Sequence, residues 1–209
     1  EIGRREILGK VGETFVKYNK IMCHACQQGK QARTSTGGST HKKQNEGVLS
    51  KEKLKPGDMV FSDQYESSMP GRFHNERGQI NTHHTYSGGT IFYDAASRYL
   101  SIHNQVGFTA EETIESKMKF ERDGLGVGVT VKKYCTDNGV YTSKAFKEHL
   151  AVSGQMLQNS GIGGHHHNAA ENQIKLTTNR ARTMIFHSAL CWPDETDLKC
   201  WPLVMDPAV

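Results

Sequence analysis

The chain has 209 residues, with 26 basic and 22 acidic side chains, a formal net charge of +4 and five cysteines. This length holds one ordinary domain with an appendage, and the low apolar share with 21 glycines favours a single core with many polar loops. No apolar run approaches the length needed to cross a bilayer, so we expect a soluble chain with no membrane partner. The odd, uneven cysteines exclude a disulfide framework and indicate a reducing compartment.

The N-terminal part predicts a metal-binding tail and a linker. A helix is expected from Glu13 to Met22, and Cys23-x-x-Cys26 has the spacing with which two thiolates bind one zinc ion. Two thiolates are half of a tetrahedral site, so residues 1–34 are interpreted as the tail of a zinc-binding segment. The polar run that follows predicts a linker at 35–54. Residues 55–209 form the core, and because the chain starts at Glu1 and stops at Val209 without a terminating signal, we expect both ends to be cut from something longer, the core at its C-terminus.

Beyond the turn Pro56-Gly57-Asp58, strand and helix patterns alternate. In chain order, we predict strands at 59–65, 90–93 and 99–106, a helix opening at Thr109, a strand at 127–135, a helix at 143–152, a strand at 155–157, a helix at 169–189 and the start of another at 203–209. In the first helix, Thr109 is the expected N-cap, and Ile114, Met118 and Leu125 fall at helical spacing. Residues 74–87 are expected to form a loop. This order predicts an α/β fold with a mixed sheet flanked by helices.

Three carboxylates stand where they can converge. Asp63 lies inside an apolar strand, where a charge is costly without compensation; Asp137 ends a second strand; and Glu171 lies in the first turn of the last helix, where the helix dipole favours an acid. Each has an ordinary alternative: an exposed strand residue, an Asp-Asn-Gly turn and a helix-start acid. If they meet at one edge of a sheet, they repel one another and require cations, for which carboxylate oxygens favour Mg²⁺ or Mn²⁺.

Two such ions, about 3.5–4 Å apart, can activate an attacking oxygen and stabilise the leaving oxygen of a phosphoryl displacement. In that arrangement Asp63 would bridge both ions, while Asp137 and Glu171 would each complete one of them. The three acids therefore predict a two-metal site for nucleic-acid chemistry.

At these positions the sequence resembles the integrase core of copia-type retrotransposons, in the retroviral integrase and ribonuclease H-like group. The resemblance covers about residues 55–209. Its matching segments are Phe61-Ser-Asp63, Phe92-Tyr-Asp94-Ala-Ala-Ser97-Arg98-Tyr99, Tyr134-Cys-Thr-Asp137-Asn138-Gly139-Val-Tyr-Thr-Ser143 and His167-Asn168-Ala-Ala-Glu171-Asn172, which continues into 179–185.

The resemblance implies a ribonuclease H-like, five-stranded mixed sheet and a magnesium-dependent site made of Asp63, Asp137 and Glu171. It implies insertion of element DNA into target DNA by attack of a 3′-OH, sometimes after end trimming. It implies homo-multimers that bridge two DNA ends, in the nucleus and in cytoplasmic virus-like particles. It also implies two histidines upstream of the cysteine pair, which this sequence lacks. The interval between Asp137 and Glu171 is two residues shorter than is usual in the family.

DNA contacts are expected beside these acids. Asn138 and Asn168 adjoin the acids in the matching segments, which implies positioning roles at the DNA. Lys175 and Arg182 continue the helical stripe that bears Glu171, and such residues can follow phosphates. A merely solvated basic face is the alternative for this stripe.

Other polar features have simpler interpretations. His165-His166-His167 lies in a glycine-rich stretch and is interpreted as a solvated loop. Asp94, a rival acid, is interpreted as a turn residue that pairs with Arg98. Two other functions stay open for the chain: a ribonuclease H-like nuclease that uses the same acids with water as the nucleophile, and a catalytically inactive relic that serves as a DNA-binding or assembly module.

Overall fold

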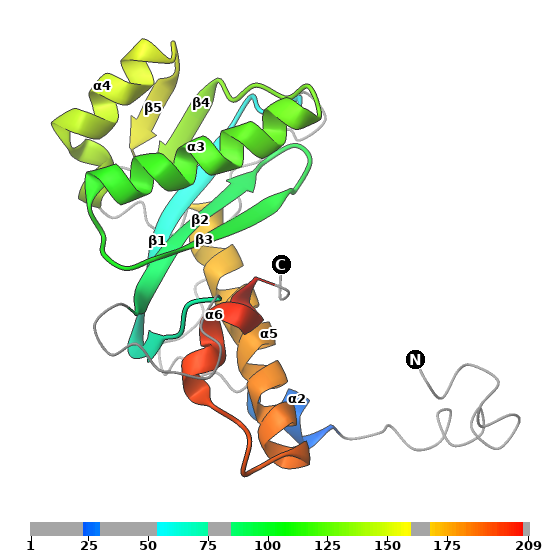
Figure 1. Cartoon of the computed structure of the whole chain (residues 1–209). Helices are drawn as coiled ribbons and strands as arrows, with labels where there is room; N and C mark the ends of the chain where they lie inside the picture. Colours follow the sequence, from blue (N-terminus) through cyan, green and yellow to red (C-terminus); the bar gives the residue numbers. More distant parts are fainter. Residues whose placement is uncertain (1–22, 30–53, 75–84, 160–167, 207–209) are drawn as a thin grey trace, which may run out of the picture.

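The structure, a computed structural model, describes residues 23–29, 54–74, 85–159 and 168–206. Its centre is one five-stranded mixed sheet with the strand order β3-β2-β1-β4-β5 (Figure 1). The first three strands form an antiparallel meander, β4 is parallel to β1, and β5 is parallel to β4. The strands are β1 (Val60–Gly71), β2 (Tyr86–Asp94), β3 (Leu100–Gln105), β4 (Lys133–Thr136) and β5 (Met156–Asn159).

Helices cover both faces of this sheet, as Figure 1 shows. One face packs against α3 (Ala110–Gly126), the short 3-10 helix η3 (Gly139–Thr142) and α4 (Lys144–Val152). The other face packs against α5 (Ala169–Cys191) and α6 (Trp201–Met205). The 3-10 helix η5 (Leu198–Cys200) precedes α6, and α2 (His24–Gly29) packs along α5. The predicted fold class, a mixed five-stranded sheet flanked by helices, is confirmed.

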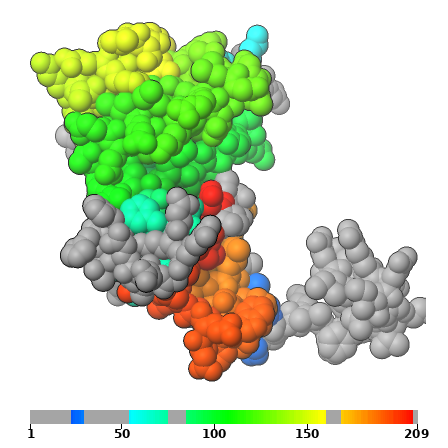
Figure 2. All heavy atoms as spheres, viewed as in Figure 1, coloured from blue at the N-terminus to red at the C-terminus, as the bar shows by residue number. Residues whose placement is uncertain are grey.

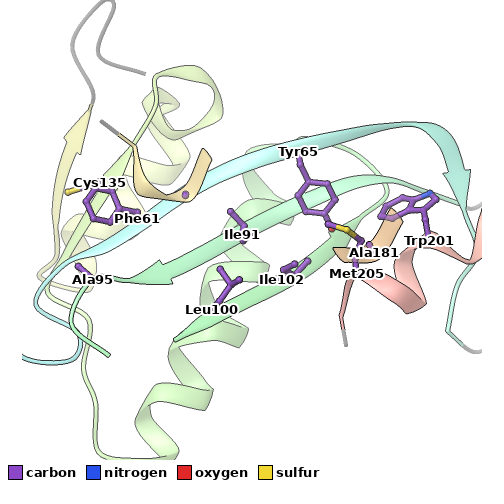
Figure 3. Close-up of a cluster of buried hydrophobic side chains, with 11 residues drawn as sticks. Phe61, Tyr65, Ile91, Ala95, Leu100, Ile102, Cys135, Ala181, Trp201 and Met205 are labelled. Carbon is purple, nitrogen blue, oxygen red and sulfur yellow. The ribbon is translucent and has the colours of Figure 1, made fainter. Parts of the chain in front are cut away.

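The alternation of side chains along β1 separates two hydrophobic cores. Val60 belongs to the core under α3, with Phe92, Tyr134 and Phe146. Phe61 and Tyr65, one and five residues further along β1, belong to the core under α5 and α6. Figure 3 shows this second core; its buried members are Phe61, Tyr65, Ile91, Ala95, Leu100, Ile102, Cys135, Ala170, Ala181, Trp201 and Met205.

Aromatic packing fixes α3 and α6 on their faces. On the α3 side, the ring of Phe92 stacks on Phe120 with centroids 5.0 Å apart. On the other side, Trp201 meets Tyr65 edge to face at 6.2 Å, and its indole N–H donates to the carbonyl of Met69 over 2.7 Å. Offset and edge-to-face pairs of this kind are worth about 0.5–1.5 kcal/mol beyond burial, so each anchors its helix in register.

The buried face of α3 differs from the sequence-based expectation. Met118 and Leu125 are 48% and 62% exposed, whereas Thr113, Ser116, Lys117 and Phe120 are buried. The polar residues of this face find partners: Gln64 donates to Thr113, Gln105 donates to Ser116, and Lys117 pairs with Glu121 at 3.0 Å. Ile114 is partly buried against the core under α3, as its spacing predicted. For Met118 and Leu125 the apolar spacing was a wrong guide, because these hydrogen bonds compensate for the burial of polar residues. The N-cap prediction is confirmed, since the side chain of Thr109 accepts from the amide of Glu112.

Asp94 has the structural role expected of it, but with other partners. It is buried, and its carboxylate accepts from the amide of Gly57 over 2.9 Å and from both the amide and the hydroxyl of Ser97. Arg98 contributes its backbone amide to the carbonyl of Asp94 and takes a positive φ of 63°. The amides of Gly57 and Ser97 and the hydroxyl of Ser97 therefore hold the carboxylate of Asp94, in place of the predicted pairing with the Arg98 side chain.

Several strand limits differ from prediction for identifiable reasons. β2 begins at Tyr86, inside the predicted loop, and includes Gly88 and Gly89. A Cβ at Gly89 would lie 2.3 Å from the carbonyl oxygen of His103 in β3, so the close strand pairing requires glycine there. β4 is much shorter than predicted, because the amides of Val127 and Gly128 bond back to carbonyls at the end of α3 and form its C-terminal turn.

The last long helix matches its predicted start and extends slightly past its predicted end. On the inward side of this helix, Ala170, Thr177 and Ala181 are buried, while Ile174 and Ile185 are partly buried against the core under α5 and α6. In Figure 2 the C-terminal half of α5 (orange) projects below the body of the molecule next to α2 (blue). No described helix is long and apolar enough to span a membrane. The predictions for residues 13–22, the linker up to residue 53, the histidine loop and residues 207–209 fall outside the described residues.

Candidate active site

Asp63 and Asp137 lie side by side on neighbouring strands. The parallel register of β1 and β4 pairs Ser62 with Thr136, the last residue of β4; Asp63 comes next in β1, and Asp137 is the first residue after β4. Neighbouring strands are about 4.8 Å apart, so the two carboxylates start from adjacent backbone positions. Because side chains alternate along a strand, the side chain of Asp63 points to the same face of the sheet as those of Phe61 and Tyr65, which is the face covered by α5. Both aspartates are partly buried.

The N-terminus of α5 is attached to the same place. Asn168 is the N-cap of α5, and its side-chain oxygen accepts from the amide of Ala170 over 3.0 Å. Its side-chain nitrogen donates to the carbonyl oxygen of Ser62 over 3.3 Å, directly before Asp63 in the chain. Glu171 lies in the first turn of this helix and is exposed. One buried asparagine therefore ties the start of the Glu171 helix to the strand that carries Asp63.

The local bonds of the two aspartates are alike. Asp63 accepts from the amide of Gln64 over 2.8 Å, and Asp137 accepts from the amide of Asn138 over 2.7 Å, in each case through Oδ1. A bond to the following amide limits the rotation of each carboxylate. Both carboxylates are therefore held in an orientation in which their oxygens can serve as metal ligands.

The two carboxylates suit a hard divalent cation chemically, but the described acids do not form a complete site. Two carboxylates on adjacent strands supply the oxygen ligands that Mg²⁺ and Mn²⁺ prefer. Among the described residues, however, no group of three His, Cys, Asp or Glu side chains is close enough to hold a metal ion. The structure therefore brings Asp63 and Asp137 together and the backbone of the Glu171 helix to them, but it does not close a three-acid group.

A buried tyrosine lies beneath the two aspartates and was given no role from sequence. The hydroxyl of Tyr141, in η3, is 2.9 Å from that of Ser62, and both residues are buried. Burial raises the pKa of Tyr141, and the negative charges of Asp63 and Asp137 raise it further. The hydroxyl therefore stays protonated next to two acids. Strand alternation could have placed Ser62 opposite Asp63, but nothing in the sequence indicates that Tyr141 reaches it.

The residues predicted to contact DNA divide into two kinds. Asn138, Lys175 and Arg182 are exposed, so their side chains are accessible to a phosphate backbone. Asn168 is only 5% exposed, and both polar atoms of its side chain are used in the two hydrogen bonds described above. Its role in the structure is to position α5, and only the other three remain candidates for contact with DNA.

Comparison with known proteins yields structural matches alone. No family model and no curated protein matches the chain. The chain is similar to the HTLV-2 integrase catalytic core domain in complex with magnesium, in a trimeric form (15% identity, TM-score 0.47, covering 74% of this chain and 84% of that chain). The dimeric form gives 15% identity and a TM-score of 0.47, over 73% and 86% of the two chains.

A third match is the simian T-cell lymphotropic virus intasome in complex with PP2A regulatory subunit B56 gamma. Its identity is 16% and its TM-score 0.49, over 88% of this chain and 55% of that chain. These likenesses concern the fold, so the functional assignment below is argued from the residues of this chain.

The cysteine pair lies apart from the acids, on α2. The amide of Cys26 lies 3.3 Å from the sulfur of Cys23, within one helical turn, and both thiols are partly buried. The spacing of the pair predicts half of a zinc site. In the described part of the chain no further Cys, His, Asp or Glu completes it, so zinc binding stays a prediction.

Proposed function

We propose that this chain is a core of a copia-type integrase, a polynucleotidyl transferase that inserts element DNA into target DNA with Mg²⁺ or Mn²⁺. The observation that carries the proposal is the convergence of three chain segments: the adjacent strand positions of Asp63 and Asp137, and the α5 N-terminus bonded to Ser62. An acid within one strand, an acid directly after its neighbour and an acid at a helix start can together supply the oxygen ligands that phosphoryl transfer with two cations needs.

In this proposal Asp63 and Asp137 hold the cations, and Glu171 completes the site. Bound cations would supply activation of the attacking 3′-OH and stabilisation of the leaving oxygen. The chain's own contribution is preorganisation: Oδ1 of each aspartate is oriented by the next amide. Glu171 is exposed in a first helical turn, so its side chain has room to turn toward the aspartates when their charge is neutralised.

One observation favours a second candidate function. The described residues contain no closed three-acid group, which is what an inactive relic acting as a DNA-binding or assembly module would also present. The two candidates differ in cation binding, because a module that only binds DNA does not need a paired-aspartate site.

Two measurements test the proposal. In a calorimetric titration with Mn²⁺, the wild type is expected to bind and Asp137→Asn to lose binding, with Asp123→Asn on α3 as the matched control that binds normally. In a strand-transfer assay, Glu171→Gln is expected to lower the rate at least 100-fold, because it removes an acid that completes the site. Equal strand transfer by Glu171→Gln and the wild type would contradict the catalytic assignment, and Mn²⁺ binding without strand transfer would favour the inactive module.

Other parts of the proposal come from the family resemblance alone. We extend to this chain the expectations of homo-multimers that bridge two DNA ends, of a zinc ion bound through Cys23 and Cys26 in a longer protein, and of location in the nucleus and in cytoplasmic virus-like particles. A chain that stayed monomeric on DNA ends in sedimentation would contradict the first of these.

A further inference from the structure

A chain of buried polar side chains crosses the α3 side of the sheet and ends beneath the two aspartates. From the α3 end, Ser116 donates its hydroxyl to the carbonyl of Glu112 and accepts from the side-chain amide of Gln105 over 3.0 Å. Gln105 in turn accepts from the hydroxyl of Thr90 over 2.9 Å. All of these bonds lie on the face of the sheet opposite α5.

The remaining contacts are made by hydroxyl groups. The hydroxyl of Thr90 also interacts with the hydroxyl of Tyr141. Tyr141 also lies 2.9 Å from the hydroxyl of Ser62. The Tyr141 hydroxyl thus has one hydroxyl neighbour on β1, Ser62, and another on β2, Thr90.

This chain ties together two segments that the sheet itself does not pair. The last described pair of the β1–β4 ladder is Ser62 with Thr136, one residue before the aspartates. Beyond it, the chain leaves β4 through Asp137 and enters η3, which carries Tyr141. The Ser62–Tyr141 bond therefore reaches from the residue before one acid to the short helix after the other. Two like charges this close repel one another, and a tie on the opposite face resists their separation.

We propose that Tyr141 is a positioning residue of the cation site: its hydroxyl, bonded by Ser62, holds η3 against β1 and so keeps Asp63 and Asp137 at the spacing that a divalent cation needs. This inference rests on the proposed function, in which the two aspartates are the cation ligands. A site held in its bound geometry binds more tightly, because less ordering is left to the moment of binding. Tyr141 itself contacts neither the cation nor DNA in this role.

The substitution Tyr141→Phe isolates the hydroxyl. The phenyl ring keeps its edge-to-face contact with Phe146, at a centroid distance of 5.3 Å, and its place in the α3-side core. Only the oxygen is removed. Loss of one such bond corresponds to about a three- to tenfold weaker affinity for Mn²⁺. Ser62→Ala removes the same bond from its other end and is expected to weaken Mn²⁺ binding by a similar factor.

Tyr134→Phe is the matched control. Tyr134 is also a buried tyrosine of the α3 side, and its hydroxyl donates to Glu121 over 2.7 Å. Its removal is expected to lower the stability about as much as Tyr141→Phe does, but to leave Mn²⁺ affinity within twofold of wild type. In the double variant Ser62→Ala with Tyr141→Phe, the loss should equal that of either single variant, because both delete one interaction.

The experiment is a Mn²⁺ titration of the full chain followed by electron paramagnetic resonance of the unbound ion. Weaker binding in both Tyr141→Phe and Ser62→Ala, with a normal Tyr134→Phe, supports the inference; if Tyr141→Phe does not fold, Ser62→Ala decides alone. Wild-type affinity in these variants overturns the inference, while loss of binding in Asp137→Asn shows that the aspartates still bind the cation, so the proposed cation site survives that failure. If the wild type itself binds no Mn²⁺, the proposed function and this inference fail together.

Discussion

Two aspartates of this chain, Asp94 and Asp63, belong to paired strands and have opposite surroundings. Asp94, at the end of β2, is 4% exposed and its carboxylate is taken up by the amide of Gly57 and by Ser97. Asp63 is partly buried, and its Oδ1 accepts from the next amide. Two amides and the Ser97 hydroxyl donate to the Asp94 carboxylate, which makes Asp94 a structural residue, whereas the position of Asp63 beside Asp137 suits it to a cation.

Asp94→Ala tests the structural assignment. The change leaves the buried amide of Gly57 without its acceptor, so we expect a loss of about 3 kcal/mol in the free energy of unfolding. Equilibrium unfolding in urea measures it. Glu111→Ala, at an exposed position in the first turn of α3, is the control and should change stability by no more than about 0.5 kcal/mol. A stability loss in Asp94→Ala no larger than in this control would mean that the turn is held by other contacts.

At the scale of elements, α5 connects the candidate site with the rest of the molecule. Its first turn is bonded to β1 through Asn168, its middle packs on the α5-side core, and its C-terminal half runs past the sheet beside α2 (Figure 1). Gly29 of α2 lies so close that a Cβ there would be 2.8 Å from the Cα of Thr183. The helix therefore fixes the place of Glu171 at one end and of the cysteine-bearing segment at the other.

Asn168→Ala should loosen this attachment. It removes the N-cap and the bond to Ser62 together, so we expect a stability loss of about 1–2 kcal/mol and a several-fold slower strand transfer. Ser143→Ala is the matched control, because Ser143 caps α4 in the same way, accepting from the amide of Phe146, but has no bond to β1. The control should lose stability without slowing strand transfer beyond that loss; equal kinetic effects would argue against a positioning role for Asn168.

The exposed stripe of α5 leads to a prediction about DNA. Lys175 and Arg182 are exposed on the helix that carries Glu171. If each neutralises one phosphate, replacement of either by Ala should reduce the slope of log affinity against log salt by about 1. Fluorescence anisotropy with duplex DNA at several salt concentrations measures this slope. An unchanged slope in both variants would assign the stripe to a solvated face, and Lys144→Ala on α4, also exposed, serves as the control.

At the scale of the whole molecule, packing decides the protonation of two histidines. Burial lowers the pKa of His103 from 6.5, helped by the charge of Lys119 and opposed by Asp123 and Asp206. Burial also lowers the pKa of His149, with Lys117 adding to the shift and Glu121 opposing it. One histidine lies in β3 and the other in α4, and burial favours the neutral imidazole in both.

The free energy of unfolding should therefore fall as the pH is lowered from 7 toward 5. The unfolded chain takes up protons near the ordinary pKa of 6.5, whereas the folded chain does so only at lower pH, so the unfolded state binds more protons in this window. The slope contributed by each histidine is at most about 1.4 kcal/mol per pH unit. Urea unfolding at several pH values measures this slope. The double variant His103→Gln, His149→Gln should show a flatter dependence of the free energy of unfolding on pH. An unchanged dependence would contradict the assignment.

The sequence by itself determined the order of the elements and indicated three acids as candidate cation ligands. Hydrophobic spacing and capping residues located the helices at Thr109, Ser143 and Ala169 because these signals are local: a cap bonds to an amide within three residues. The three acids were found because a charge within or at the end of an element is costly or conspicuous wherever the chain goes. Five strands and their alternation with helices were also sufficient to predict the mixed sheet.

Only the tertiary structure decided which of these residues meet. Ser62, Tyr141 and Asn168 are bonded across 79 and 106 positions of the chain, and no local pattern encodes such contacts. The inward face of α3 was decided in the same way, because polar residues can be buried where distant partners satisfy them. The glycines of β2 look like loop residues until β1 and β3 press against them. The physical reason is common to all of these cases: the free energy of a buried polar or close-packed position depends on its neighbours in space, and the fold supplies those neighbours.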